Sequence, residues 1–246
     1  MSLLSDFDPA AVDTVSLPEV QAVAFDLYRD IHKGIRADLF TVTSAAGYID
    51  PSSRDARVGL AGEVSRLMSF LDDHAAHEDT HIEPAVERLL PEIAAQIDQD
   101  HRSFERRGEL LVELAMHAVD ATAVAQRGCV HRLYLELASF TSTYLAHQDI
   151  EERVIMPALD RALGVEGNLA IHGAILGSIP PEKMMESMQV MLPAMNVDDR
   201  TELLGGMAAS APPPAFAAVW SLAQQIVPKP DVATLSTRLG LPLDAA

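Results

Sequence analysis

Apolar residues recur every three or four positions along most of the chain, which is the spacing of one face of a helix. The clearest run includes one histidine: Phe25, Tyr28, His32, Ile35 and Leu39. Stretches of alternating β-branched residues, which would predict strands, are absent. The pattern therefore predicts an all-α protein.

Four long helices are predicted in the first two-thirds of the chain. They span residues 18–43, 53–90, 91–119 and 123–163. Asp50 and Pro51 mark the turn after the first of them. Four long helices joined by short connections predict an up-down-up-down four-helix bundle over residues 18–163.

Glycine and proline interrupt this pattern from Gly164 onward, so we expect a smaller helical appendage over residues 164–246. Its predicted helices span residues 181–192, 198–209 and 213–227. Four methionines form a helical stripe in it: Met184, Met188, Met191 and Met195. Such a stripe either packs into the appendage, because methionine fills irregular gaps, or forms a face for a protein partner or for self-association.

Two of the predicted helices carry the same polar motif, His-x3-Glu-x5-Pro. The motif comprises His74, Glu78 and Pro84 in one helix, and His147, Glu151 and Pro157 in the other. Residues 59–90 and 132–163 align without a gap around it, which predicts two helix hairpins related by a pseudo-two-fold axis. Residues four apart share one helix face, so the histidine and glutamate of each motif can bind one metal ion.

An isolated histidine precedes each motif, His32 before the first and His101 before the second. Four histidines and two glutamates predict a dinuclear metal site at the centre of the bundle. Imidazole and carboxylate ligands without thiolate suit iron, manganese or zinc. Iron is the preferred metal, because two histidines and a carboxylate leave non-haem iron open to oxygen, whereas zinc does not change its oxidation state.

The composition of the chain argues against several classes of function. The 246 residues carry a net charge of −18, which argues against binding to a nucleic-acid backbone. The single cysteine, Cys129, excludes a cysteine-based zinc cluster and fits a reducing cytoplasm. No apolar run reaches about 18 residues, so no membrane span is expected.

The six predicted ligands resemble the signature of the hemerythrin-like family, the HHE cation-binding domains. That signature is an isolated His followed by His-x3-Glu, repeated once, and it is present here over residues 18–163. The resemblance implies a four-helix bundle around two iron ions bridged by carboxylates and by an oxo or hydroxo group. It also implies dioxygen or peroxide as the small ligand.

One position departs from the oxygen-carrying members, which place a second histidine four residues after the first on the third helix. Here that residue is Glu105, which puts classical oxygen carriage in doubt and is itself a candidate ligand or a partner of Arg36. His81 and His77 lie near the first motif but have no counterparts in the second, so they are weaker candidates.

Three functions remain open on the sequence alone. The first is binding or sensing of oxygen, iron or redox state by a di-iron centre. The second is an enzyme that disproportionates or reduces hydrogen peroxide, or that handles nitric oxide. The third is an interaction protein that is stabilised by its metal and docks a partner through residues 164–246.

Overall fold

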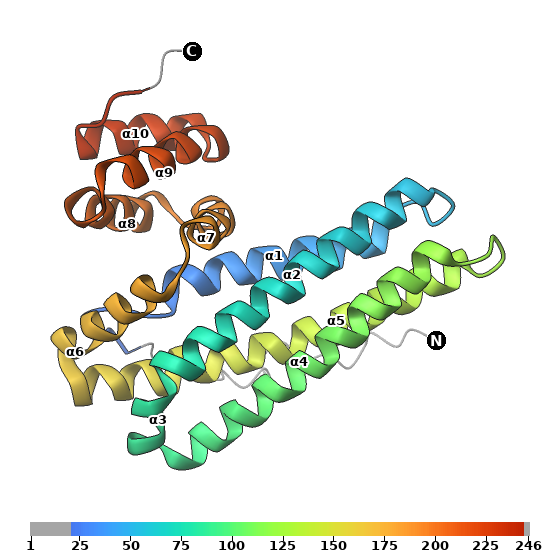
Figure 1. The fold of residues 1–246 in the computed structure, drawn as a ribbon, viewed down its shortest axis with the longest axis horizontal. Coiled ribbons are helices and arrows are strands. Elements are labelled where there is room, and N and C mark those ends of the chain that lie inside the picture. Colours follow the sequence, from blue (N-terminus) through green and yellow to red (C-terminus); the bar gives the residue numbers. More distant parts are fainter. Residues whose placement is uncertain (1–20, 244–246) are drawn as a thin grey trace, which may run out of the picture.

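The protein is all-helical in a computed structural model that describes residues 21–243, so the all-α prediction is confirmed (Figure 1). The predicted start at residue 18 lies outside the described residues. The elements are α1 (Arg29–Tyr48), α2 (Arg54–His81), α3 (Glu83–Leu89), α4 (Pro91–Asp120), α5 (Gln126–Ile150), a π-helical turn η2 (Glu151–Ile155), α6 (Met156–Ser178), α7 (Pro181–Ala194), α8 (Val197–Ser210), α9 (Pro213–Ile226) and α10 (Lys229–Leu239).

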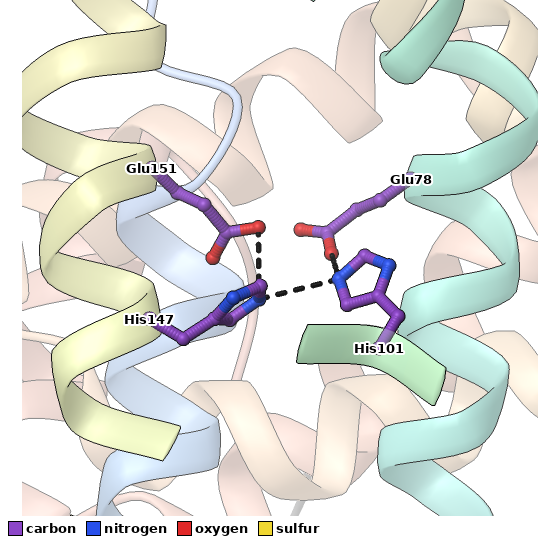
Figure 2. Close-up of side chains that lie close together, drawn as sticks. All are labelled: Glu78, His101, His147 and Glu151. Atoms are coloured by element: carbon purple, nitrogen blue, oxygen red, sulfur yellow. Dashed lines mark hydrogen bonds and ion pairs between the residues drawn. The ribbon is translucent and has the colours of Figure 1, made fainter. Parts of the chain in front are cut away.

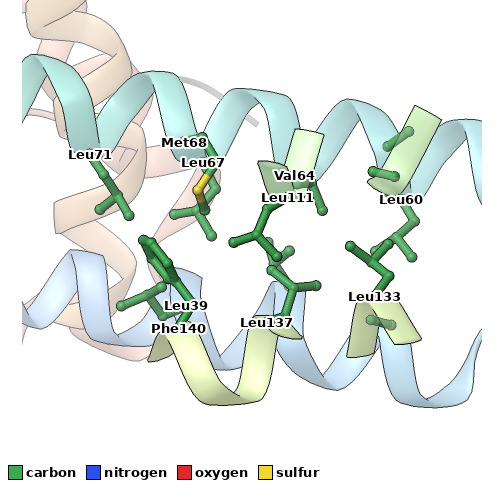
Figure 3. Close-up of a cluster of buried hydrophobic side chains, with 14 of the residues drawn as sticks. Leu39, Leu60, Val64, Leu67, Met68, Leu71, Leu111, Leu133, Leu137 and Phe140 are labelled. Carbon is green, nitrogen blue, oxygen red and sulfur yellow. The ribbon is translucent and has the colours of Figure 1, made fainter. Parts of the chain in front are cut away.

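Four long helices, α1, α2, α4 and α5, pack side by side around one apolar core (Figures 1 and 3). Their inward faces repeat at helical spacing, so each turn adds a large side chain to the core. Leu39, Leu67 and Leu137 come from three of these helices and have no exposed surface. Most of the stability of these helices therefore comes from burial of their apolar faces.

The first helix begins later than the sequence pattern predicts. Residues 21–28 are not helical, so Phe25 and Tyr28 precede α1. The carboxylate of Asp26 accepts hydrogen bonds from the backbone N–H groups of Tyr28 and Arg29, at 2.9 and 3.0 Å. These N–H groups have no partner within a helix that starts here, and an aspartate just upstream supplies one. The helix also runs on to Tyr48, past the predicted end at residue 43.

The matched prolines interrupt both motif-bearing helices at equivalent places. Proline has no N–H and cannot donate to the carbonyl four residues earlier. Before Pro84, α2 ends at His81 and α3 begins at Glu83. Before Pro157, the chain forms the π-helical turn η2. The single helix predicted over residues 53–90 is therefore two, and both irregular stretches lie within four residues of the motif glutamate.

The C-terminal helices form a second apolar cluster of their own. Met188, Met191 and Met195 are buried in it beside Trp220, so the methionine stripe packs inside the appendage. The predicted helices there match α7, α8 and α9 closely, but α10 was missed. It begins after Pro228 with Pro230 in its first turn, where a missing N–H costs nothing.

The predicted boundary at Gly164 coincides with a kink rather than with the end of a helix. Gly164 has φ of 63°, a left-handed conformation that glycine adopts readily, and helix α6 continues beyond it to Ser178. Ile171 and Ile175 pack on apolar residues of the first two-thirds of the chain. The division into domains at this point stays a prediction.

Helix α7 lies directly against α1 (Figure 1). A Cβ atom on Gly34 would lie 3.0 Å from Cγ1 of Val190, so the missing side chain permits this close approach. Lys33 of α1 forms an ion pair with Asp199, and Arg29 forms one with Glu202 at 3.0 Å. The appendage is therefore attached to the helix that carries His32.

Among the described residues, no single helix is both long and apolar enough to cross a membrane. One sharply bent combination, Gln126–Ser178 with Pro181–Ala194, satisfies the same length and composition criteria.

We expect Leu137→Ala to lower the free energy of unfolding by about 2–5 kcal/mol, because it leaves a cavity where Leu137 has no exposed surface. Chemical denaturation followed by circular dichroism measures this. The matched control is Leu110→Ala, whose side chain is 57% exposed and whose loss should cost no more than about 0.5 kcal/mol. Equal effects of the two substitutions would contradict the placement of this core.

Candidate metal centre

The structure brings all six predicted ligand residues together at one level of the long helices. His32 lies on α1, His74 and Glu78 on α2, His101 on α4 and His147 on α5, while Glu151 is the first residue of η2. Glu78 and Glu151 point toward each other from opposite sides of the centre, with His101 and His147 beside them (Figure 2). The helices therefore bring together three side chains from each half of the repeat.

Each glutamate contacts the histidine one helical turn before it. Oε1 of Glu78 lies 3.1 Å from Nε2 of His74, and Oε1 of Glu151 lies 3.3 Å from Nε2 of His147. Each glutamate also reaches a histidine of the other hairpin. Oε2 of Glu78 lies 3.4 Å from Nε2 of His101, and Oε2 of Glu151 lies 3.5 Å from Nε2 of His32. All four imidazoles thus direct Nε2 at the two carboxylates.

The donor atoms fall into two overlapping groups, within each of which they lie within 4.8 Å of one another. One group contains Glu78, His101, His147 and Glu151, and the other contains His32, His74 and Glu78. Glu78 is common to both groups. Binding of two metal ions by these six residues stays a prediction.

Buried atoms without hydrogen-bond partners indicate that a cation fits here. In the described part of the chain they include Nε2 of His32, both carboxylate oxygens of Glu78 and Oε2 of Glu151. A buried polar atom without a partner is costly, and buried charges are normally paired or coordinate a metal. Imidazole nitrogens and carboxylate oxygens converging without thiolate form a donor set that suits iron, manganese or zinc.

The carboxylates and imidazoles of the site shift each other's pKa values. Burial lowers the pKa of His32, but the hydrogen bond to Glu152 and the charges of Glu78 and Glu151 outweigh it and raise that pKa to about 9. Burial would raise the pKa of Glu78, yet the surrounding imidazoles hold it well below its usual range. Burial likewise lowers the pKa of His101, but Asp79 and Glu78 outweigh it and raise that pKa to about 10. Metal binding at these two imidazoles would therefore displace protons.

In three of the four histidines, the other ring nitrogen, Nδ1, faces an acidic residue outside the predicted ligand set. Glu152 lies 3.0 Å from Nδ1 of His32, and Asp79 lies 2.7 Å from Nδ1 of His101. Asp100 lies 3.5 Å from Nδ1 of His147, too far for a hydrogen bond. We had not predicted these residues, although the repeat carried a signal: Asp79 and Glu152 each follow the motif glutamate directly.

The weaker candidate residues lie outside both donor groups. Glu105 is exposed on α4, so ligation by Glu105 is not supported. Its suggested pairing with Arg36 was wrong, because Arg36 binds Glu152 with both guanidinium nitrogens. His81 lies 3.2 Å from the hydroxyl of Ser178, and His77 is also outside both groups.

A cavity of about 240 Å³ is lined by residues of α2, α4 and α5, and His101 is the one predicted ligand in its lining. Tyr144, Phe104 and Phe140 also line it. Acidic residues line it as well: Asp72, Asp79, Asp98 and Glu105. A small molecule can therefore approach His101 without passing through the apolar core.

Comparison with known proteins agrees with the geometry. The family model described as the hemerythrin HHE cation-binding domain matches residues 23–159, more than half of the chain. The chain therefore belongs to the hemerythrin HHE cation-binding family, and its cluster of histidines and glutamates suggests metal binding. No curated protein and no solved structure gave a match.

We expect Glu78→Gln to reduce metal content at both donor groups, because an amide carries no charge and Glu78 belongs to both. Metal analysis of purified protein, with circular dichroism to verify folding, measures the loss. Glu63→Gln on the same helix is the control, since that side chain is 57% exposed and faces Arg66. Metal content equal to that of the unsubstituted protein in both variants would show that Glu78 is not a ligand.

Proposed function

We propose that this protein is a non-haem di-iron protein that binds iron and oxygen species and acts in oxygen, iron or redox sensing or binding. Its long helices α1, α2, α4 and α5 would form the up-down-up-down bundle of the family. The ligands would be His32, His74, Glu78, His101, His147 and Glu151. Iron is preferred over manganese and zinc because the donor set combines imidazole and carboxylate and leaves room for a small ligand.

One observation carries the proposal: two carboxylates face each other between four imidazoles in a buried site. Glu151 is 1% exposed and Glu78 is 5% exposed. Two buried carboxylates repel each other and lose their hydration, so they require positive charge between them. Two divalent cations supply that charge more fully than protons on the histidines.

Bound iron would supply reversible electron transfer and an open position for a small ligand. The protein residues would do the rest. His101 and Tyr144, which line the cavity, would lie beside a ligand that enters it, and the rings of Phe104 and Phe140 would make part of its surroundings apolar. Dioxygen and peroxide are small enough to enter a cavity of about 240 Å³.

The same cavity favours one second candidate, an enzyme that disproportionates hydrogen peroxide or handles nitric oxide. Both molecules are small and would reach His101 by the path described above. Disproportionation needs no external reductant, because one peroxide is oxidised to dioxygen while another is reduced to water. The buried methionine stripe gives no support to docking of a protein partner on that face.

Metal analysis of the purified protein, combined with its absorption spectrum before and after hydrogen peroxide, tests the proposal. We expect about two irons per chain, one for each donor group. A reversible spectral change with little turnover would favour binding or sensing, and rapid dioxygen release lost in His147→Ala would favour the enzyme. Zinc as the bound metal, or no metal after iron reconstitution, would refute the redox functions.

Removal of the metal should destabilise the protein, because its binding free energy adds to the folded state alone. At a free metal concentration about 100-fold above Kd, the loss on chelation should be about 3 kcal/mol for each ion removed. Thermal unfolding with and without chelator measures this. Glu78→Gln serves as the control, since its unfolding temperature should respond much less to the chelator.

A further inference from the structure

Two of the carboxylates outside the ligand set occupy equivalent positions in the internal repeat. Asp79 follows Glu78, and Glu152 follows Glu151. Each lies within hydrogen-bond distance of Nδ1 of an isolated histidine, at 2.7 Å for His101 and 3.0 Å for His32. The contact therefore occurs twice, once in each half of the pseudo-symmetric centre.

Both contacts cross from one hairpin to the other. Asp79 on α2 holds a histidine of α4, while Glu152 on η2 holds a histidine of α1. Each hairpin thus supplies a glutamate to the centre and, from the next residue, an acceptor for the partner hairpin's histidine. Each half of the repeat therefore fixes the ring orientation of one histidine in the other half.

The chemistry of the contact determines which nitrogen is available at the centre. A carboxylate oxygen only accepts hydrogen bonds, so Nδ1 of His101 and of His32 must carry the proton. Their Nε2 atoms, which face the glutamates, are then the nitrogens left to bind a cation. Carboxylates behind metal-bound histidines fix both the tautomer and the ring orientation.

We propose that Asp79 and Glu152 are a matched pair of positioning residues that set His101 and His32 for metal binding. The inference rests on the proposed metal site, but not on the metal being iron or on any redox chemistry. Neither residue belongs to a donor group, so each acts through its histidine.

The two positioning residues differ in how firmly they are held. Arg36 binds both oxygens of Glu152, at 2.6 and 2.9 Å, and the Glu152 side chain is 27% exposed. The Asp79 side chain is 53% exposed and lies at the cavity rim. Solvent weakens an exposed charged contact, so the effect of losing Asp79 should be the smaller one.

Competitive titration of metal-free protein against a chromophoric chelator tests the pair. The variants are Asp79→Asn and Glu152→Gln, and the control is Glu113→Gln, an exposed residue of α4. Iron(II) under anaerobic conditions and zinc(II) are titrated separately. We expect both metals to bind about 10- to 100-fold more weakly to the two variants, more so to Glu152→Gln, and the control to match the unsubstituted protein.

Two further measurements separate positioning from a merely structural role. Thermal unfolding of the metal-free variants reports any loss of folding stability, and the visible bands of cobalt(II)-loaded protein report ligand geometry. We expect the cobalt bands to change in both variants and not in Glu113→Gln. Variants that unfold at lower temperature yet bind with unchanged affinity and unchanged cobalt bands would overturn the inference.

The outcomes for this inference and for the proposed function are distinct. If the protein binds zinc but not iron and the variants bind zinc more weakly, the redox functions fail and the positioning role stands. If it binds two irons and both variants bind them with affinity within about twofold of the unsubstituted protein, the positioning role fails alone. Binding of neither metal would overturn both.

Discussion

The burial of two opposed carboxylates, Glu78 and Glu151, is the constraint on which the rest of the site depends. A buried carboxylate without a partner of opposite charge costs several kcal/mol. The chain meets this cost with one imidazole from each of α1 and α4 and one from each motif helix. The arrangement leaves buried oxygens and nitrogens without hydrogen bonds, and a bound cation would satisfy them. The packing of the four long helices serves to hold this charge arrangement together.

Apolar residues on both sides of the centre strengthen the electrostatic interactions between its side chains. One apolar cluster, which includes Leu71 and Phe104, lies on one side of it, and a second, which includes Ile82 and Ile155, lies on the other. Between these layers the effective dielectric constant is low, so the contacts of Glu78 and His101 are stronger than they would be in water. The breaks at the matched prolines come just where each motif helix passes from one cluster to the other. Helical irregularity of this kind, including π-helical turns, is frequent at functional sites.

Helix α1 packs against the appendage just where it presents a ligand candidate to the centre. Ile31 of α1 packs on both the apolar core of the four long helices and the methionine-rich core of the appendage, and the next residue is His32. The close approach at Gly34 and the ion pair of Lys33 with Asp199 fix α1 from its outer side. The helix that presents His32 is thus held by the glutamates from within and by α7 and α8 from outside.

The sequence by itself determined the helical class, the repeat and the six residues at the centre. The two His-x3-Glu pairs follow from spacing, because residues four apart on a helix share a face whatever packs against it. His32 and His101 follow from their matching places before the two motifs. It did not determine where α1 begins, since the side chain of Asp26 rather than the apolar pattern sets that point. Only the tertiary structure decided that Arg36 pairs with Glu152, that Glu105 lies outside, and that Asp79 and Glu152 lie behind the histidines. Those contacts join residues 22 to 120 positions apart, and their geometry depends on how whole helices pack rather than on any local pattern.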